Sequence, residues 1–309
     1  MDQQNAKPKR SLLRIVLRNY QVYLLLLPCI IYFALFCYGP MYGLQIAFKN
    51  YNTGLGILGS EWAGLKWFQQ FLSSGVFWGI FKNTLVLSVY TIIVGFPLPI
   101  ILALMLNEVR SLRFKKITQT ISYAPHFIST VVIVSMITLF LSPSSGVINK
   151  IIEAFGGDAV YFMIKPKLFQ HIYAFSGIWQ HVGWSSIIYL AALTGIDPTL
   201  YEAAQMDGAS RMRCIWHINL PSLRPVIVIS LILSAGGVLG GDFEKILLMQ
   251  NASIMETADV ISTYVYRLGI GMSQFSLSSA IGVFNSVINF IVLLLVNKIC
   301  RKVGDTSLW

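Results

Sequence analysis

Long apolar runs separated by short polar segments make up most of this chain. Each run reaches or exceeds the ~20 residues that an α-helix needs to cross the hydrocarbon core of a bilayer. We predict six membrane-spanning helices, at residues 20–48, 81–107, 117–141, 171–195, 222–241 and 277–299. The pattern therefore predicts an all-α membrane protein, in which residues 20–299 form one membrane domain between short ends at 1–19 and 300–309.

A polar stretch between the fourth and fifth runs departs from this pattern. Residues 197–221 read DPTLYEAAQMDGASRMRCIWHINLP and are too polar to cross a bilayer. Asp197 is suited to cap a first short helix, Gly208 permits a break, and Pro221 is expected to stop a second short helix. We predict a small helical knob, exposed at one membrane face, with a narrow apolar strip for docking on a partner formed by Ala203, Met206, Ala209 and Met212.

The basic residues predict the orientation of the chain. Only 12% of the 309 residues are charged, about half of the ~25% found in soluble domains. Of the 23 Lys and Arg, 15 lie in 1–19, in 110–116, in the polar stretch with its exit, and in 298–302. The positive-inside rule places this richer set in the cytoplasm, together with both termini. The same distribution explains the net charge of +10 without nucleic acid as a partner.

The polar stretch resembles the EAA loop of permeases from binding-protein-dependent ABC importers. The family pattern is EAA, three residues, Gly, nine residues and then I-x-L-P, and every fixed position occurs here at that spacing. The resemblance implies a cytoplasmic coupling helix that seats on an ATPase subunit. The coupling residues that it implies are Glu202, Ala203, Ala204, Asp207, Gly208, Leu220 and Pro221. An ordinary cytoplasmic helical hairpin is the alternative.

Further segments extend the resemblance over nearly the whole chain. Residues 23–48, 95–110, 119–129 and 306–309 are similar to the LplB-type branch of the MalF-like carbohydrate-uptake permeases. The resemblance implies a six-helix type I importer core (MetI-like) in the bacterial cytoplasmic membrane. It also implies alternating-access import of oligosaccharides, derived from polysaccharides, from an extracytoplasmic solute-binding protein. The implied partners are a second permease, forming a heterodimer, and two ATPase subunits that bind ATP and Mg.

Common catalytic motifs are missing from the sequence. Without a GxxxxGK[ST] loop, the chain has no phosphate-binding loop of its own, and HExxH and GxSxG are absent too. The four cysteines form no CxxC pair, so we expect no metal and no bound cofactor. We expect a transporter subunit surrounded by lipid rather than an enzyme. The alternatives are an importer of the same architecture for a non-sugar solute, and a membrane-embedded enzyme.

Polar and aromatic side chains inside two of the runs mark a candidate substrate pathway. Polar groups are costly in hydrocarbon, so they usually face the bundle interior or a pathway. The candidates are Trp179, His181, Trp184 and Tyr189 in the fourth run, and Asn285 and Asn289 in the last. Aromatic faces stack on sugar rings, and imidazole or amide groups bind hydroxyls. Interface anchoring of the tryptophans, a structural histidine and hydrogen bonds between helices are the alternatives.

Glycines end the fifth run, in the sequence GGVLGGDF at residues 236–243. Glycine permits either close helix approach or local unwinding of the kind that transporters use near substrate sites, and the sequence leaves both open. In the outer segments we predict an amphipathic helix near 147–155 and a surface helix at 261–268.

Overall fold

The computed structural model describes residues 19–304 of the 309-residue chain. Nearly all of the predicted N-terminal segment 1–19, and the tail from residue 305 on with the family-like ending 306–309, lie outside the described residues. The described part is helical apart from two short strands, β1 and β2, which pair antiparallel. The all-α prediction is therefore confirmed.

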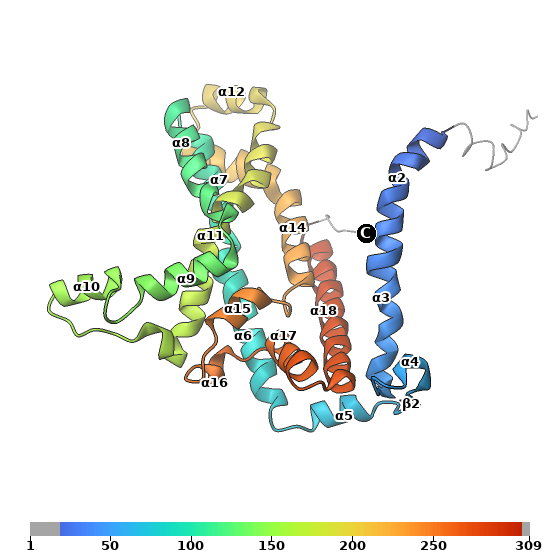
Figure 1. The fold of residues 1–309 in the computed structure, drawn as a ribbon. Helices are drawn as coiled ribbons and strands as arrows, with labels where there is room; N and C mark the ends of the chain where they lie inside the picture. The colour runs from blue at the N-terminus through green and yellow to red at the C-terminus, as the bar shows by residue number, and fades with distance from the viewer. Residues whose placement is uncertain (1–18, 305–309) are drawn as a thin grey trace, which may run out of the picture.

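The first half of the chain runs from a long apolar helix through a compact outer turn into two further helical stretches (Figure 1). Its elements are α2 (Tyr20–Tyr32), the π turn η1 (Phe33–Tyr38), α3 (Gly39–Met41), the 3-10 helix η2 (Tyr42–Phe48), β1 (Lys49–Asn50), α4 (Gly56–Gly59), β2 (Glu61–Trp62), α5 (Lys66–Leu72), α6 (Phe77–Gly95), α7 (Pro97–Glu108), α8 (Leu112–Tyr123), the 3-10 turn η3 (Ala124–Phe127), α9 (Thr130–Phe140) and α10 (Val147–Ala154).

The second half contains the longest single helices and the helical knob predicted at residues 197–221. Its elements are the 3-10 turn η4 (Phe162–Ile164), α11 (Pro166–Thr194), α12 (Pro198–Met206), α13 (Arg211–Cys214), the π turn η5 (Ile215–Asn219), α14 (Leu220–Gly236), α15 (Phe243–Met249), α16 (Met255–Ala258), α17 (Ile261–Tyr266), the π turn η6 (Arg267–Gly271) and α18 (Phe275–Gly304).

Four helical stretches of the described chain are long and apolar enough to cross a membrane. They are Tyr20–Phe48, Phe77–Glu108, Arg211–Gly236 and Phe275–Lys302. The four corresponding predictions at 20–48, 81–107, 222–241 and 277–299 overlap them. The first has identical bounds, and the others differ at their ends because helices continue past the apolar run at the membrane boundary or stop earlier at glycine.

The third predicted span, 117–141, is not a straight helix. α8 and α9 meet at 101°, and together they count as a fifth candidate span. Pro125 in η3 has no N–H to continue the ladder of α8, and Ile128 and Ser129 are extended (ψ 131° and 150°) before α9 begins. The prediction of one continuous helix was wrong because an apolar run carries no information about such a bend.

The elbow between α8 and α9 is fixed against α11. The Gln180 side chain of α11 donates from Nε2 to the carbonyl of Ile128 at 3.2 Å. At buried Gly183 the two helices approach so closely that a Cβ would overlap the backbone carbonyl of Ser122. Small residues allow such approach between helices in membranes.

The fourth predicted span, 171–195, lies in the 29-residue helix α11 except for its last residue, Gly195, which is the C-cap. α11 is long enough to cross a bilayer, but it is less apolar than the four stretches named above and is not one of them. It carries Gln180 and His181 in its middle. α11 contacts α6, α7, α8 and α14, so it is the central helix of the bundle.

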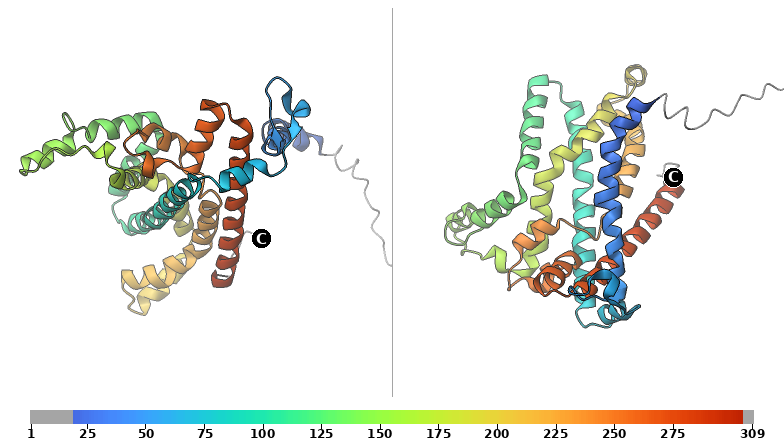
Figure 2. Two further views of the ribbon diagram at one scale, coloured as in Figure 1. Left: turned by 90° about the horizontal axis from the view of Figure 1, so that it is seen from below. Right: turned by 45° about the vertical axis from the view of Figure 1, so that its right-hand side comes forward.

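The loops and short helices that connect the long helices lie at two opposite ends of the molecule. Figure 1 shows α12, the α7–α8 connection and the start of α2 at one end, and α4, α5, α16 and α17 at the other. The predicted helix at 147–155 is confirmed as α10, which extends sideways from the bundle (Figures 1 and 2). The helix predicted on the surface at 261–268 begins as α17, but Ile261 and Thr263 are buried, so it is part of a packed core.

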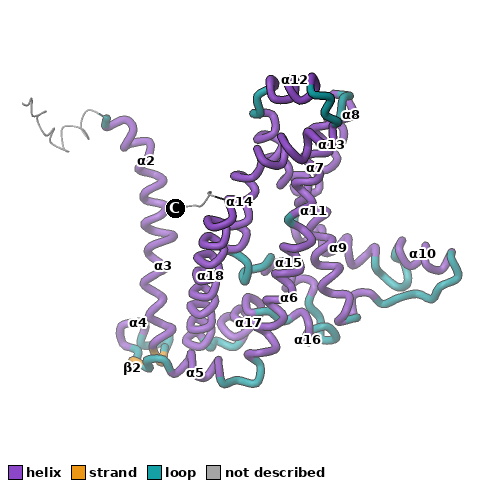
Figure 3. The backbone as a smooth tube through the Cα atoms, turned by 180° about the vertical axis from the view of Figure 1, so that it is seen from behind, coloured by secondary structure: helices purple, strands orange, loops and turns teal. Residues whose placement is uncertain are grey.

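Helix α2 stands clear of the bundle in views from opposite sides (Figures 1 and 3). None of its residues is buried within the described chain, whereas its continuation η2 packs on α18. Leu25 is 81% exposed and Leu24 is 64% exposed. An apolar helix of this kind is left to contact lipid or another chain.

Candidate functional site

In the structure the helical knob comprises residues 197–214, which is shorter than the predicted 197–221. It begins with an N-cap at Asp197. The Asp197 carboxylate accepts the backbone N–H of Thr199 at 2.9 Å, and Pro198 occupies the first helical turn of α12. This backbone hydrogen bond lowers the pKa of Asp197 from its usual value. The cap stabilises the start of α12 because it accepts one of the unpaired N–H groups of the first turn, and the proline helps because it has no N–H to leave unpaired.

Gly208 ends α12 in a Schellman motif. Its φ is +72°, a conformation that costs residues with a Cβ roughly 1–2 kcal/mol. The Gly208 N–H donates to the carbonyl of Gln205 at 3.0 Å, and the Ala209 N–H donates to that of Ala204 at 2.8 Å. The spacing of the EAA-x-x-x-G pattern therefore has a backbone explanation, because the glycine lies where the helix C-terminus requires a left-handed residue.

The knob presents apolar side chains outward. Met206 is 89% exposed and Met212 is 62% exposed. The Tyr201 hydroxyl donates to the Asn219 side chain at 2.6 Å and ties α12 to η5. Of the predicted coupling residues, Glu202, Ala203, Ala204, Asp207 and Gly208 belong to the knob, while Leu220 and Pro221 lie at the start of α14.

Pro221 does not stop the second helix of the knob. α13, η5 and α14 run as one helical stretch from Arg211 to Gly236. Proline clashes with the carbonyl four residues earlier, which is that of His217, and this residue lies inside the wider π turn of η5. The π turn therefore lets the helix pass the proline, and the predicted stop was wrong.

A cavity of about 630 Å³ lies between α6, α7, α11, α14 and α15. This volume is within the range of small-ligand sites. The lining is mainly apolar, and its polar members are Thr84, Ser88, Thr91, Tyr173, His181, Ser185, Tyr189, Ser230, Ser234, Asp242 and Lys245. Hydroxyls therefore dominate the polar groups of this cavity, with the two charged residues at the α15 side.

The predicted pathway residues fall into two groups. His181 and Tyr189 line the cavity, whereas Trp179, Trp184, Asn285 and Asn289 are not among its lining residues. Trp184 stacks on His126 with ring centroids 4.5 Å apart. The Nδ1 atoms of His126 and His181 are 3.1 Å apart, so one ring donates to the other. The histidines and Trp184 thus join the α8–α9 elbow to α11 beside the cavity.

The glycine-rich segment after α14 forms one wall of the cavity. The helix ends at Gly236, and Gly237 to Gly241 continue along the lining outside the helix. The Leu239 N–H donates to the Asn289 side chain of α18 at 3.0 Å. The glycines therefore serve both roles considered from the sequence. The helix is unwound after Gly236, and α18 approaches Gly236 so closely that a Cβ there would lie 2.6 Å from the Leu293 side chain.

Asn289 and Asn285 are predicted to differ in stability effects. Asn289→Ala leaves the Leu239 N–H unpaired, which costs about 1–3 kcal/mol for a buried donor. Asn285→Leu removes an amide oxygen that is buried without a partner among the described residues, so we expect no loss of stability. Thermal unfolding of the detergent-solubilised chain should separate the two variants. Equal melting temperatures would show that the Asn289 hydrogen bond does not hold the glycine segment.

Lys245 is a functional candidate that the sequence patterns do not reveal. It is 1% exposed, and its Nζ has no hydrogen-bond partner among the described residues. The ammonium lies 5.5 Å from the centre of the Tyr173 ring. Burial lowers the pKa of Lys245, in α15 outside the candidate spans, to about 8, against an opposing effect of Asp242. The distribution of basic residues along the sequence does not show that Lys245 lies on the buried face of α15, beside Ile246 and Met249.

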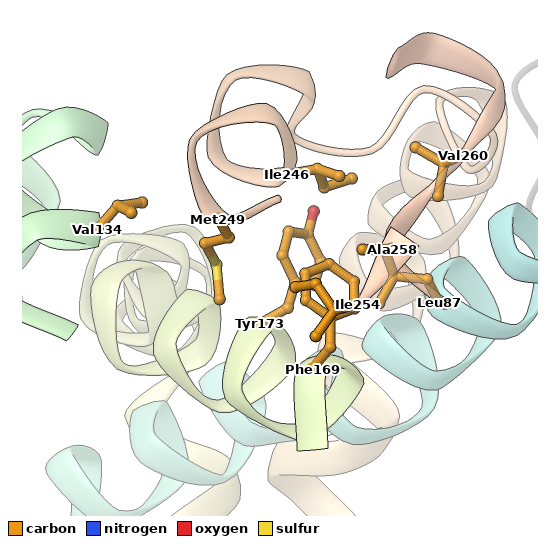
Figure 4. Close-up of a cluster of buried hydrophobic side chains, with 9 residues drawn as sticks. All are labelled: Leu87, Val134, Phe169, Tyr173, Ile246, Met249, Ile254, Ala258 and Val260. Atoms are coloured by element: carbon orange, nitrogen blue, oxygen red, sulfur yellow. The ribbon is translucent and has the colours of Figure 1, made fainter. Parts of the chain in front are cut away.

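A packed cluster holds α15 in position above α11. Figure 4 shows Tyr173 and Phe169 rising from α11, with the Tyr173 hydroxyl beside Ile246. The Asp242 N–H donates to this hydroxyl at 3.0 Å. The Asp242 carboxylate in turn accepts the Lys245 backbone N–H at 3.2 Å and caps α15. The position of Lys245 is thus fixed by a cap at one side and an apolar core at the other.

The fold and the cavity define a multi-pass helical membrane protein. Residues 95–305 match the family described as binding-protein-dependent transport system inner membrane component. The chain belongs to this family, and it is therefore a permease subunit of an ABC transporter rather than an enzyme. The predicted family membership is confirmed.

Two relatives from Bacillus subtilis (strain 168) match nearly the whole chain. The polygalacturonan/rhamnogalacturonan transport system permease protein YteP is 46% identical over 303 residues, covering 98% of this chain and 94% of the relative. Protein LplB is 41% identical over 292 residues, covering 94% and 92%. A crystal structure of a bacterial alginate ABC transporter, in complex with an alginate pentasaccharide-bound periplasmic protein, contains a chain with a TM-score of 0.89. That chain is 43% identical, with 96% of this chain and 99% of the other covered.

Proposed function

We propose that this permease imports oligosaccharides by alternating access, through the cavity between α6, α7, α11, α14 and α15. One observation carries the proposal: the helical stretch that starts in the exposed knob ends at the glycine wall of the cavity. A partner that moves the knob thereby acts on the place where cargo is held. The family provides the energy source for such movement, since its members work with separate ATPase subunits.

The transmembrane core that we propose has six spans. Four are the long apolar stretches, the fifth is the bent pair α8–α9, and the sixth is α11. The Lys- and Arg-rich 110–116 segment lies at the same end as α12 (Figure 1), which supports placing that end in the cytoplasm. Both termini then belong to the cytoplasmic side of a bacterial cytoplasmic membrane.

The knob is proposed as the ATPase-coupling element. Exposed Met206 and Met212 supply the apolar contact, and Glu202 and Asp207 flank it with charge. Gly208 sets the angle between the two short helices. ATP and Mg²⁺ are assigned to the two ATPase subunits, whose closure displaces the knob and opens the cavity outward; hydrolysis reverses this movement.

The remaining partners are assigned to exposed surfaces of the described chain. The apolar faces of α2, which no other helix of the described chain covers, are assigned to lipid and to a second permease subunit. The end that carries α4, α5, α16 and α17 is assigned to a solute-binding protein. The relative crystallised with a periplasmic binding protein supports this assignment.

The cavity suits a sugar cargo. Tyr173 and Tyr189 provide aromatic surface, and the hydroxyls of Thr91, Ser230 and Ser234 provide hydrogen-bonding groups. YteP is named for polygalacturonan/rhamnogalacturonan transport, and the solved transporter is named for alginate. These names support an oligosaccharide derived from a polysaccharide.

Purification from native membranes in mild detergent tests the proposal. We expect a second permease and an ATPase to co-purify with this chain. The complex, reconstituted in liposomes with its binding protein, should import labelled oligosaccharides only with ATP and Mg²⁺. Liposomes given a non-hydrolysable ATP analogue are the control. Recovery of the chain alone, under conditions that keep another importer intact, or import without ATP, would contradict the proposal.

A further inference from the structure

Lys245 is a buried cation, at the wall of the proposed pathway, whose ammonium has no direct hydrogen bond or ion pair among the described residues. Its Nζ is shielded from solvent, and neither a hydrogen bond nor an ion pair to this atom occurs among the described residues. Arg267, also in the outer segment, is by contrast paired with Asp259. Burying an unpaired charge is strongly unfavourable, so such a group is found where something else compensates for it.

The neighbouring groups of Lys245 do not provide that compensation in full. The Asp242 carboxylate lines the same cavity, but it accepts the Lys245 backbone N–H rather than the ammonium. The ring of Tyr173 offers its face at 5.5 Å, which gives a weak cation–π contact. His181, the histidine of this cavity, already shares a hydrogen bond with His126. The ammonium keeps three donors and no acceptor.

Among the described residues that line the cavity, Lys245 is the one lysine or arginine and Asp242 the one carboxylate, and the others are hydroxyl, imidazole and apolar residues. Gly177, one turn from Tyr173 on α11, lies directly beside the ammonium: a Cβ there would be 3.6 Å from Nζ, in ordinary van der Waals contact. The lysine stem is flexible and can turn its ammonium toward the cavity when the bundle opens. A carboxylate is the anion that fits an oligosaccharide pathway, because uronic acids carry one on each sugar ring.

We propose that Lys245 recognises a carboxylate of the cargo, so that this permease imports acidic, uronate-containing oligosaccharides. The inference rests on the proposed oligosaccharide function and adds the charge of the cargo and the residue that reads it. In the loaded state a uronate provides the direct ion pair that no described residue makes with this ammonium, and a charge-assisted hydrogen bond is stronger than a neutral one.

Uptake of a charged and an uncharged cargo of equal length tests the inference. The probes are trigalacturonate, its trimethyl ester and neutral arabinotriose, supplied to liposomes that contain the complete importer and its binding protein. The central variant is Lys245→Met, because methionine is unbranched and apolar. It removes the charge and places no new polar group in the buried site. Lys245→Arg keeps a cation, and Lys298→Gln removes an exposed lysine at the far end of α18.

We expect Lys245→Met to lower trigalacturonate uptake about 10- to 100-fold, the size expected for losing a hydrogen bond between charged groups. Lys245→Arg should stay within about threefold of wild type, and Lys298→Gln should not differ from it. Recovery of the partner subunits and ATP hydrolysis without cargo should be unchanged in Lys245→Met. These two readouts separate carboxylate recognition from a merely structural role.

Several outcomes overturn the inference. One is uptake of trigalacturonate by Lys245→Met at the wild-type level. Another is an equal loss of uptake for trigalacturonate and its trimethyl ester in this variant. A wild-type importer that takes up arabinotriose but not trigalacturonate also overturns it, while leaving the oligosaccharide function intact. If the wild-type importer takes up none of the three probes, the proposed function fails and the inference fails with it. Should Lys245→Met not assemble, Lys245→Gln is measured in its place, by the same criteria.

Discussion

Replacing Gly208 by proline is expected to abolish transport while the chain still inserts and folds. Proline fixes φ near −65°, whereas the turn between α12 and α13 needs +72°. The substitution also removes the N–H that donates to the Gln205 carbonyl. A misplaced proline costs about 3 kcal/mol, so the turn is expected to change its conformation and thereby the angle between α12 and α13. Because about 3 kcal/mol corresponds to a factor of more than ~100 in an equilibrium, we expect uptake to fall at least ~100-fold. Insertion should survive because the site is open, with no atom within 4 Å of the place that a Cβ would occupy.

Two matched substitutions separate the backbone effect from a side-chain effect. Gly208→Asn should keep most of the activity, because asparagine tolerates the left-handed conformation, whereas Gly208→Val should lose most of it. Membrane abundance and co-purification of the partner permease report insertion, and labelled-sugar uptake reports coupling. Normal uptake by correctly assembled Gly208→Pro would show that the knob's turn does not transmit movement.

Replacing Gly183 by valine should prevent the subunit from folding stably. A Cβ at this position overlaps the backbone carbonyl of Ser122, and neither helix can yield without moving the α8–α9 elbow. Overpacking of this kind costs about 3 kcal/mol, near the upper end of its usual range. We expect little assembled complex in membranes and loss of the Gln180 hydrogen bond to Ile128. Size-exclusion chromatography and thermal unfolding of the solubilised chain measure the effect.

Gly79→Ala in α6 is the control for Gly183→Val. No atom lies within 4 Å of a Cβ at Gly79, so this variant should assemble and melt like wild type. Gly183→Ala should fall between the two, because the Cβ alone already meets the carbonyl. Wild-type assembly of Gly183→Val would mean that α8 and α11 do not touch at this point in the membrane.

The helical class and most of the spans were predictable because apolar length alone determines where a helix must cross a bilayer. Prediction failed at the α8–α9 bend, where extended Ile128 and Ser129 follow Pro125 inside an apolar run. It also failed at Pro221, because a proline stop holds for a regular α-helix and not after a π turn. Both failures concern backbone geometry that composition does not record.

Candidate site residues were predictable only where a motif or a chemical type marked them. The EAA-x-x-x-G spacing located the knob, and His181 and Tyr189 are among the cavity lining. Lys245 was hidden because a lysine in a loop segment normally faces water. Its burial follows from the packing of Ile246 and Met249 against α11, which depends on contacts between residues some 70 positions apart.

The uninterrupted helix from Arg211 to Gly236 has a mechanical consequence. Its 26 residues correspond to a rod about 39 Å long, at 1.5 Å per residue. Two features can bend this rod, the π turn near its knob end and Pro225 inside α14. In the proposed mechanism, a displacement of the knob is transmitted along the rod to Gly237. In that mechanism the glycine segment, which lies outside the helix, takes up the displacement between the end of the rod and the cavity wall.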